Sequence, residues 1–104
     1  MSTDLNIAEI LYETGEIRFR YTRIKSSDGR HWIRDGLFCE YDKNGQVISE
    51  GHYAMGKEEG LWRDYYPNGQ LAAEGQYRNG VEVGQWRYLS PDGDEMTGED
   101  DTIR

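Results

Sequence analysis

The sequence contains one cysteine, two prolines and two histidines, and its apolar residues never form a long run. Because Cys39 has no second cysteine to pair with, no disulfide can form within the chain. The apolar runs are too short to cross a bilayer, and Met1-Ser2-Thr3-Asp4 lacks the basic and then apolar pattern of a secretory signal. These features predict a cytoplasmic protein with no membrane span.

Residue patterns that carry chemistry are equally scarce. His31 and His52 lie in different parts of the chain, Cys39 has no CxxC partner, and no glycine-rich phosphate loop leads into a helix. Neither a nucleophile next to a base nor a set of metal ligands at workable spacing is visible. The sequence therefore predicts no catalytic residue, no metal site, no cofactor and no enzymatic activity.

The charge is strongly acidic. Twenty Asp and Glu residues stand against twelve Lys and Arg, which gives a formal net charge of −8 at pH 7. A charge of this sign disfavours direct binding to nucleic acid or to anionic lipid and favours a basic partner. Residues 17–34 are the exception, because they hold six basic residues against Asp28 alone. This segment is either a binding arm or a solvated strand pair whose cations offset acidic neighbours.

Glycines and aromatic residues recur with a period of 24 residues, which is the signature of a repeat protein. In the clearest repeat, Pro67-Asn68-Gly69 suits a type I turn closed by a left-handed glycine, so residues 62–77 form a β-hairpin. The period is carried by four series: Gly36, Gly60 and Gly84; Phe38, Trp62 and Trp86; Gly45, Gly69 and Gly93; and Tyr53 and Tyr77.

The period predicts an all-β, single-domain antiparallel β-meander of repeated hairpins, about 24 residues each, in a single-layer twisted sheet. Residues 1–91 form the repeat domain, with a degenerate first repeat, a strand from about Ala8, and an insertion near 25–30. Residues 92–104 are expected to be an acidic, flexible tail. The expected strands are 17–24, 32–41, 46–53, 61–66, 70–77 and 85–89, with loops at 55–60 and 78–84.

Counting outward from the turn predicts which residues share a face. Tyr65 should pair with Leu71, and Trp62 should pair with Glu74 on the opposite face. The first face then carries an apolar stripe that forms the core: Tyr41, Val47, Tyr53, Leu61, Tyr65, Leu71, Tyr77 and Leu89. Because one face lacks cover, either the N-terminal segment folds across it or two copies pair as a homodimer.

The segments Tyr-Tyr-Pro-Asn-Gly-Gln-Leu at 65–71, Glu-Gly-Gln-Tyr at 74–77 and Gly-Gln-Trp at 84–86 resemble the bacterial variant of the MORN repeat. The resemblance covers roughly residues 36–93. It implies a meander of antiparallel hairpins and a family in which many members are called antitoxin or immunity components of toxin systems. The motif specifies turns and rings, so it bears on architecture more than on role.

A partner-binding site is predicted on the second face, where aromatic rings alternate with carboxylates. Such a surface suits a basic protein, because rings provide buried anchors and carboxylates steer the partner. The alternative is that the tryptophans pack over Gly51 and Gly75 and stiffen the sheet; the two readings are compatible. The predicted contact residues are Phe38, Glu50, Trp62, Asp64, Tyr66, Glu74, Trp86 and Tyr88.

The functional hypothesis is a non-enzymatic antitoxin or immunity protein that neutralises a basic, nuclease-type toxin. The alternative is a structural or scaffolding module for protein association or association with a membrane surface. The net charge of −8 counts against anionic lipid, with the basic segment 17–34 as the one feature in its favour.

Overall fold

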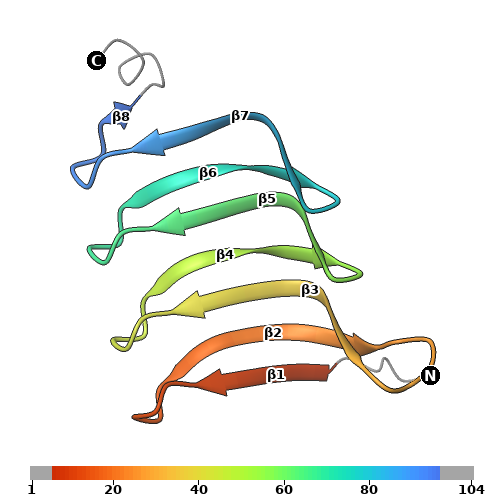
Figure 1. The fold of residues 1–104 in the computed structure, drawn as a ribbon. Helices are drawn as coiled ribbons and strands as arrows, with labels where there is room; N and C mark the ends of the chain where they lie inside the picture. The colour runs from red at the N-terminus through yellow and green to blue at the C-terminus, as the bar shows by residue number, and fades with distance from the viewer. Residues whose placement is uncertain (1–5, 97–104) are drawn as a thin grey trace.

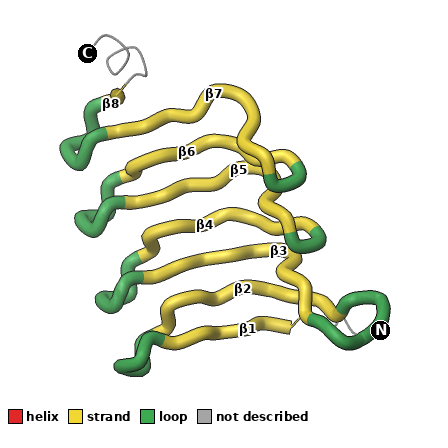
Figure 2. Tube along the Cα trace, viewed as in Figure 1, coloured by secondary structure: helices red, strands yellow, loops and turns green. Residues whose placement is uncertain are grey.

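The computed structural model describes residues 6–96, which form one antiparallel sheet whose strands lie side by side in chain order (Figure 1). No helix occurs in this range (Figure 2). The all-β meander predicted from the repeat period is therefore confirmed. Its strands are β1 (Asn6–Leu11), β2 (Ile17–Lys25), β3 (Trp32–Tyr41), β4 (Val47–Ala54), β5 (Lys57–Tyr65), β6 (Leu71–Arg78), β7 (Val81–Leu89) and β8 (Glu95–Met96).

The turns along one edge of the sheet follow the predicted chemistry. After β5, the Tyr66 N–H donates to the Gln70 carbonyl at 2.9 Å, and the Gly69 N–H donates to the Tyr66 carbonyl at 2.9 Å. Gly69 has a φ of 90°, the left-handed conformation that closes a turn of this length. The same pair of bonds recurs in the turn of residues 42–46, so the 24-residue period reproduces one turn geometry.

Two turns at the other edge are much shorter than expected. The predicted loops 55–60 and 78–84 are wrong, because the chain reverses within Met55-Gly56 and within Asn79-Gly80 (Figure 2). Both residues of each pair have positive φ, as two-residue type I′ turns require. Strands β5 and β7 consequently begin several residues earlier than the sequence indicated. The segment near 25–30, which was predicted to be an insertion, lies at the loop between β2 and β3.

A β-bulge changes the register within each of the first three hairpins. Tyr65 pairs with Leu71 as predicted, but Ala72 is an extra residue in β6, so that Trp62 lies opposite Gly75 and Arg63 opposite Glu74. A shift of one residue moves side chains to the other face of a sheet. The predicted pairing of Trp62 with Glu74 is therefore wrong, and so is the predicted division of residues between the faces.

One face of the sheet, here called the aromatic face, carries a continuous row of rings. Neighbouring rings lie with centroids 5.2–6.2 Å apart, several of them edge to face, which is a favourable arrangement for aromatic pairs. Phe38 and Trp62, expected on the exposed face, are only 7% and 8% exposed, whereas Leu61, expected in the core, is 42% exposed. The row consists of Phe19, Tyr21, Phe38, Tyr53, Trp62, Tyr77 and Trp86.

Two tryptophans lie directly on glycines of the preceding strand. A Cβ on Gly51 would come within 2.2 Å of the Trp62 ring, and a Cβ on Gly75 within 2.0 Å of the Trp86 ring. Only glycine leaves room for a ring to lie flat on the backbone. The Trp62 Nε1–H donates to the His52 carbonyl at 3.0 Å, which fixes the orientation of the ring. The predicted packing of the tryptophans over glycines is therefore confirmed.

Successive hairpins are also joined at the turns by tyrosine hydroxyls. Tyr12 donates to the Tyr41 carbonyl at 2.7 Å, and Tyr66 donates to the Leu89 carbonyl at 2.7 Å. The corresponding residue of the intervening hairpin is Asp42, whose carboxylate instead accepts the backbone N–H groups of its own turn. The tyrosine bonds therefore link the first hairpin to the second and the third to the fourth.

The C-terminal part of the sequence only partly follows expectation. The fourth hairpin was expected to lack a second strand, but Glu95 pairs with Leu89 and Met96 with Tyr88. The rest of the predicted acidic tail, residues 97–104, lies outside the described residues, as does the start of the N-terminal segment, residues 1–5.

Replacing Gly75 by Ala should destabilise the fold by about 1–3 kcal/mol, because the new methyl group would collide with the Trp86 ring. Urea unfolding followed by circular dichroism measures the change. In a Trp86→Leu background the same substitution should cost clearly less, since the ring is gone. An equal cost in both backgrounds would contradict the importance of the ring contact.

Candidate functional site

The eight predicted contact residues do not form one surface. Strand alternation and the observed register place five of them on the aromatic face, two on the opposite face, and Tyr66 in a turn. The expected single site is therefore divided by the bulges at Ile48 and Ala72, which place Glu50 and Glu74 on the opposite face. The aromatic face holds Phe38, Trp62, Asp64, Trp86 and Tyr88; the opposite face holds Glu50 and Glu74.

Burial separates the structural members of this set from the accessible ones. Phe38 and Trp62 are almost completely buried, and the Tyr66 hydroxyl bonds to the neighbouring hairpin. The Trp86 Nε1–H is buried and has no hydrogen-bond partner among the described residues. Asp64 is exposed and Tyr88 is 46% exposed, so these two can meet a partner without unfolding the sheet.

An acidic patch, defined here as Glu58, Asp64 and Glu82, lies on the same face of the sheet as Tyr77. Burial raises the pKa of Tyr77, and the negative charges of Glu82, Glu58 and Asp64 raise it further. Glu58 pairs with Tyr53, and Glu82 pairs with Tyr77 one repeat later. Within residues 6–96, none of the three forms an ion pair.

Glu58 and Glu82 were missed from the sequence because both fell in segments interpreted as loops. The available signal was their spacing of 24 residues, which places each next to a tyrosine of the adjoining strand once the turn is shortened to two residues.

A basic patch, defined here as Arg23, Lys25 and Arg34, lies on the same face over β2 and β3. The Arg23 guanidinium carbon lies 4.0 Å and the Lys25 Nζ 4.4 Å from the centroid of the Trp32 ring. Arg34 lies over the rings of Tyr21 and Tyr53, at 4.9 and 5.5 Å. These are cation–π distances, and the Trp32 ring remains 42% exposed.

The cations of the basic patch are not neutralised locally. Arg18 and Arg20 pair with Glu40 and Glu9, as expected for a solvated strand pair that offsets acidic neighbours. No ion pair among the described residues involves Arg23, Lys25 or Arg34. Arg34 lines a shallow hollow of about 380 Å³ together with Tyr21, Trp32, Ile33 and Gly56. Trp32 was not identified from the sequence.

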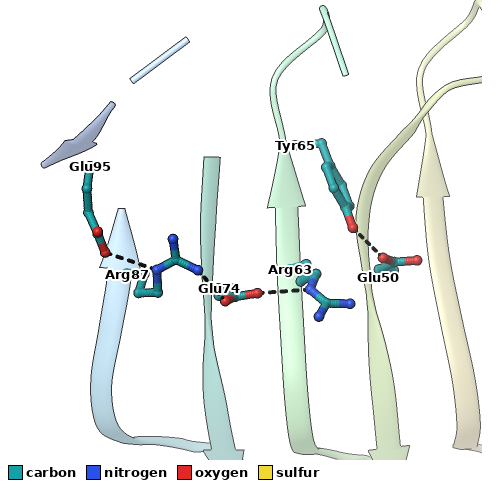
Figure 3. A network of polar contacts seen from close by, with 6 residues as sticks. All are labelled: Glu50, Arg63, Tyr65, Glu74, Arg87 and Glu95. Carbon is teal, nitrogen blue, oxygen red and sulfur yellow. Dashed lines mark hydrogen bonds and ion pairs between the residues drawn. The ribbon is translucent and has the colours of Figure 1, made fainter. Parts of the chain in front are cut away.

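The opposite face carries a chain of ion pairs across four strands (Figure 3). Glu74 accepts from Arg63 at 2.9 Å and from Arg87 at 2.8 Å, and Arg87 also contacts Glu95 at 3.0 Å. The hydrogen bonds from Arg63 and Arg87 lower the pKa of Glu74. Because its charge is already compensated by two guanidinium groups, this network favours a structural role for Glu74 over partner contact.

Tyr65 and Glu50 form a second polar contact on this face. The Tyr65 hydroxyl donates to the Glu50 Oε2 at 2.5 Å (Figure 3). Burial, followed by this bond and the charge of Glu50, raises the pKa of Tyr65 to about 12. Tyr65 was expected in an apolar core stripe but serves here as a hydrogen-bond donor to Glu50.

A shallow hollow of about 250 Å³ on the opposite face brings Cys39 and His52 into one lining with Glu50 and Arg63. No hydrogen bond joins Cys39 to His52, and no group of three metal-ligating side chains occurs, in the part of the chain that the structure describes. Between residues 6 and 96, no helix is long and apolar enough to cross a membrane.

Comparison with known families identifies the repeated hairpins. Residues 34–55 and 58–79 each match the family model described as MORN repeat variant. The two matched segments are adjacent in the sequence. The first corresponds to β3–β4 and the second to β5–β6, so the repeat resemblance is confirmed for these two hairpins. Comparisons with curated proteins and with solved structures gave no match.

Replacing Glu74 by Gln should lower the melting temperature by a few degrees at pH 7, because both ion pairs are lost. The pKa of Glu74 is lowered in the native state, so its contribution to stability is complete above its ordinary pKa and is lost as the pH falls through the lowered value. Thermal unfolding at several pH values should show the difference from wild type shrinking in acid. Glu13→Gln, at an exposed site, is the control.

Tyr65 should ionise later than ordinary tyrosines in an absorbance titration. Its native pKa of about 12 exceeds the ordinary value of 10.0, so its stabilising contribution is complete below pH 10 and is lost as the pH rises towards 12. A difference titration against Tyr65→Phe isolates this group. Glu50→Gln should lower the pKa of Tyr65; an unchanged value would exclude the Glu50 bond as a cause.

Proposed function

We propose that this chain is a non-enzymatic binding module that neutralises a basic bacterial toxin of the nuclease type by holding it on the acidic patch. The observation that carries the proposal is that Glu58, Asp64 and Glu82 share the aromatic face and that none of them is in an ion pair among the described residues. Exposed anions on a rigid sheet attract a cationic surface and select against acidic ones.

The aromatic face also supplies an anchor next to these charges. Tyr88 is 46% exposed and lies on β7, two strands from Asp64 on β5, with Ala73 of β6 paired between them. A tyrosine of this kind buries a large ring while its hydroxyl keeps a polar partner, and for this reason tyrosines are frequent among residues that dominate binding. The formal net charge of −8 favours the same class of partner. The resemblance to MORN-variant proteins supplies the antitoxin expectation.

The proposed contact set therefore differs from the set expected from the sequence. Asp64 and Tyr88 are retained, Glu58 and Glu82 are added, and Trp62 is treated as a structural residue. Tyr88→Ala should weaken toxin binding by roughly 2 kcal/mol. Trp62→Ala should instead lower the melting temperature, with affinity preserved per folded molecule.

The second candidate function is a structural module that associates with an anionic surface. The basic patch favours it, because Arg23 and Lys25 are not paired with carboxylates among the described residues and lie beside the exposed Trp32 ring. Basic residues near an aromatic ring are suited to an anionic membrane surface.

The test uses the toxin whose gene lies beside this one in the native genome. Calorimetry should detect binding by the wild-type chain, and Glu58→Lys with Glu82→Lys should weaken it about tenfold or more. Glu13→Lys with Asp92→Lys makes the same change in net charge at exposed turns and should bind like wild type. Co-expression should protect cells from the toxin only when the acidic patch is intact.

Two results would overturn the proposal. The first is equal weakening by the control pair, which would reduce the effect to net charge. The second is the absence of toxin binding together with binding to vesicles of anionic phospholipid that is lost on Arg23→Glu with Lys25→Glu. That result would favour the structural module.

A further inference from the structure

The aromatic face carries two patches of opposite charge and equal size. The basic patch comprises three cations on β2 and β3, and the acidic patch comprises three carboxylates on β5 and β7. The boundary between them is Tyr53 on β4, whose ring lies 5.5 Å from the Arg34 guanidinium and whose backbone pairs with Glu58. The charge on this face therefore changes sign across the sheet, from positive over β2 and β3 to negative over β5 and β7.

The basic patch and two members of the acidic patch, Glu58 and Glu82, lie towards the same end of the strands, whereas Asp64 lies near the turn at the other edge. Lys25 pairs with Trp32 next to the turn of residues 26–31, while Glu58 and Glu82 each follow closely on a two-residue turn at the same edge (Figure 2). A two-fold axis parallel to the strands and close to β4 and β5 reverses the strand order without exchanging the strand ends. It would bring β2 of one copy over β7 of the other, and β3 over β6.

We propose that the aromatic face is self-complementary and that a second copy of this chain docks on it face to face, with the basic patch of each copy against the acidic patch of the other. A two-fold arrangement makes both contacts at once, because the same surface serves both partners. Arg23 and Lys25 on β2 of one copy then face Glu82 on β7 of the other, and Arg34 on β3 lies one strand away from Glu58 on β5 of the other copy.

The thinness of the single layer argues for this occupant. Five apolar side chains are buried, and no side chain in residues 6–96 is fully enclosed. No described element covers the aromatic face, since all eight strands belong to one sheet. The molecule measures 54 by 33 Å in its two longest extents, so one face can exceed the roughly 800 Å² per partner of a standard interface. Pairing would also cover Trp32 and Tyr88, which are 42% and 46% exposed.

Self-pairing would occupy the acidic patch, so the second copy and a basic partner would compete for it. The inference goes beyond the proposed function and is tested without any toxin. A wild-type chain that is monomeric but binds the toxin would overturn only the self-pairing. A wild-type chain that forms the dimer but does not bind the toxin would overturn only the toxin proposal.

The experiment uses two charge-reversed proteins. One carries Arg23→Glu and Lys25→Glu, and the other carries Glu58→Lys and Glu82→Lys. Sedimentation equilibrium should give twice the chain mass of 12.1 kDa for wild type. Each reversed protein alone should self-associate at least about tenfold more weakly, because like charges now meet. Mixed in equal amounts, the two should form a heterodimer as stable as the wild-type pair.

Controls separate local pairing from net charge and from misfolding. Arg30→Glu with Arg78→Glu, and Glu13→Lys with Asp92→Lys, reverse the same numbers of charges at other exposed positions and should leave the dimer intact. A chain carrying all four patch reversals restores complementarity and should pair with itself. A monomeric wild type, loss of the dimer in a control, or a mixture of folded reversed proteins that stays monomeric would overturn the inference.

Discussion

The contact between a tryptophan ring and the glycine of the preceding strand is the constraint on which this fold depends. A single-layer sheet has no second layer to fill its core, so its apolar contacts must come from side chains lying along the sheet itself. Trp62 on Gly51 and Trp86 on Gly75 provide this by resting a ring on bare backbone. Tyr53 and Tyr77 pack edge to face against these two rings, and Phe38 connects Trp62 to Tyr21, which makes the aromatic face continuous from β2 to β7.

Much of the architecture could be predicted because turns and periods are local properties. Gly69 with Pro67-Asn68 specifies its own reversal, and the 24-residue period carries that hairpin to its neighbours. The faces could not be predicted in the same way. Their assignment depends on the parity of the register, and one extra residue at Ala72 inverts it for every position beyond the turn. The residue type at the bulge, an alanine, does not indicate from the sequence that a bulge occurs there.

The contact residues predicted from the sequence were partly wrong for two reasons. Some residues were assigned to the wrong face of the sheet, and strand residues were assigned to loops. Asp64 and Tyr88 remain surface candidates since they are exposed on the aromatic face. Glu58 and Glu82 became visible only when the two-residue turns placed them in strands. The excess of cations in 17–34 was evident from composition, but composition could not separate Arg18 and Arg20, which have carboxylate partners, from Arg23, Lys25 and Arg34, whose positions over rings depend on the folded sheet.

The residue at one turn position, which is Tyr12, Asp42 or Tyr66 in successive hairpins, affects where the sheet unfolds locally. Tyr12 joins the hairpin β1–β2 to β3–β4, and Tyr66 joins β5–β6 to β7–β8, but Asp42 makes no such bond from the second hairpin to the third. At this edge the junction of β4 with β5 therefore lacks the tyrosine hydrogen bond that joins the first hairpin to the second and the third to the fourth. Amide hydrogen exchange across the β4–β5 junction should therefore be fastest beside this turn edge, whereas the Trp62 ring on Gly51 and its hydrogen bond to the His52 carbonyl protect the rest of the same junction.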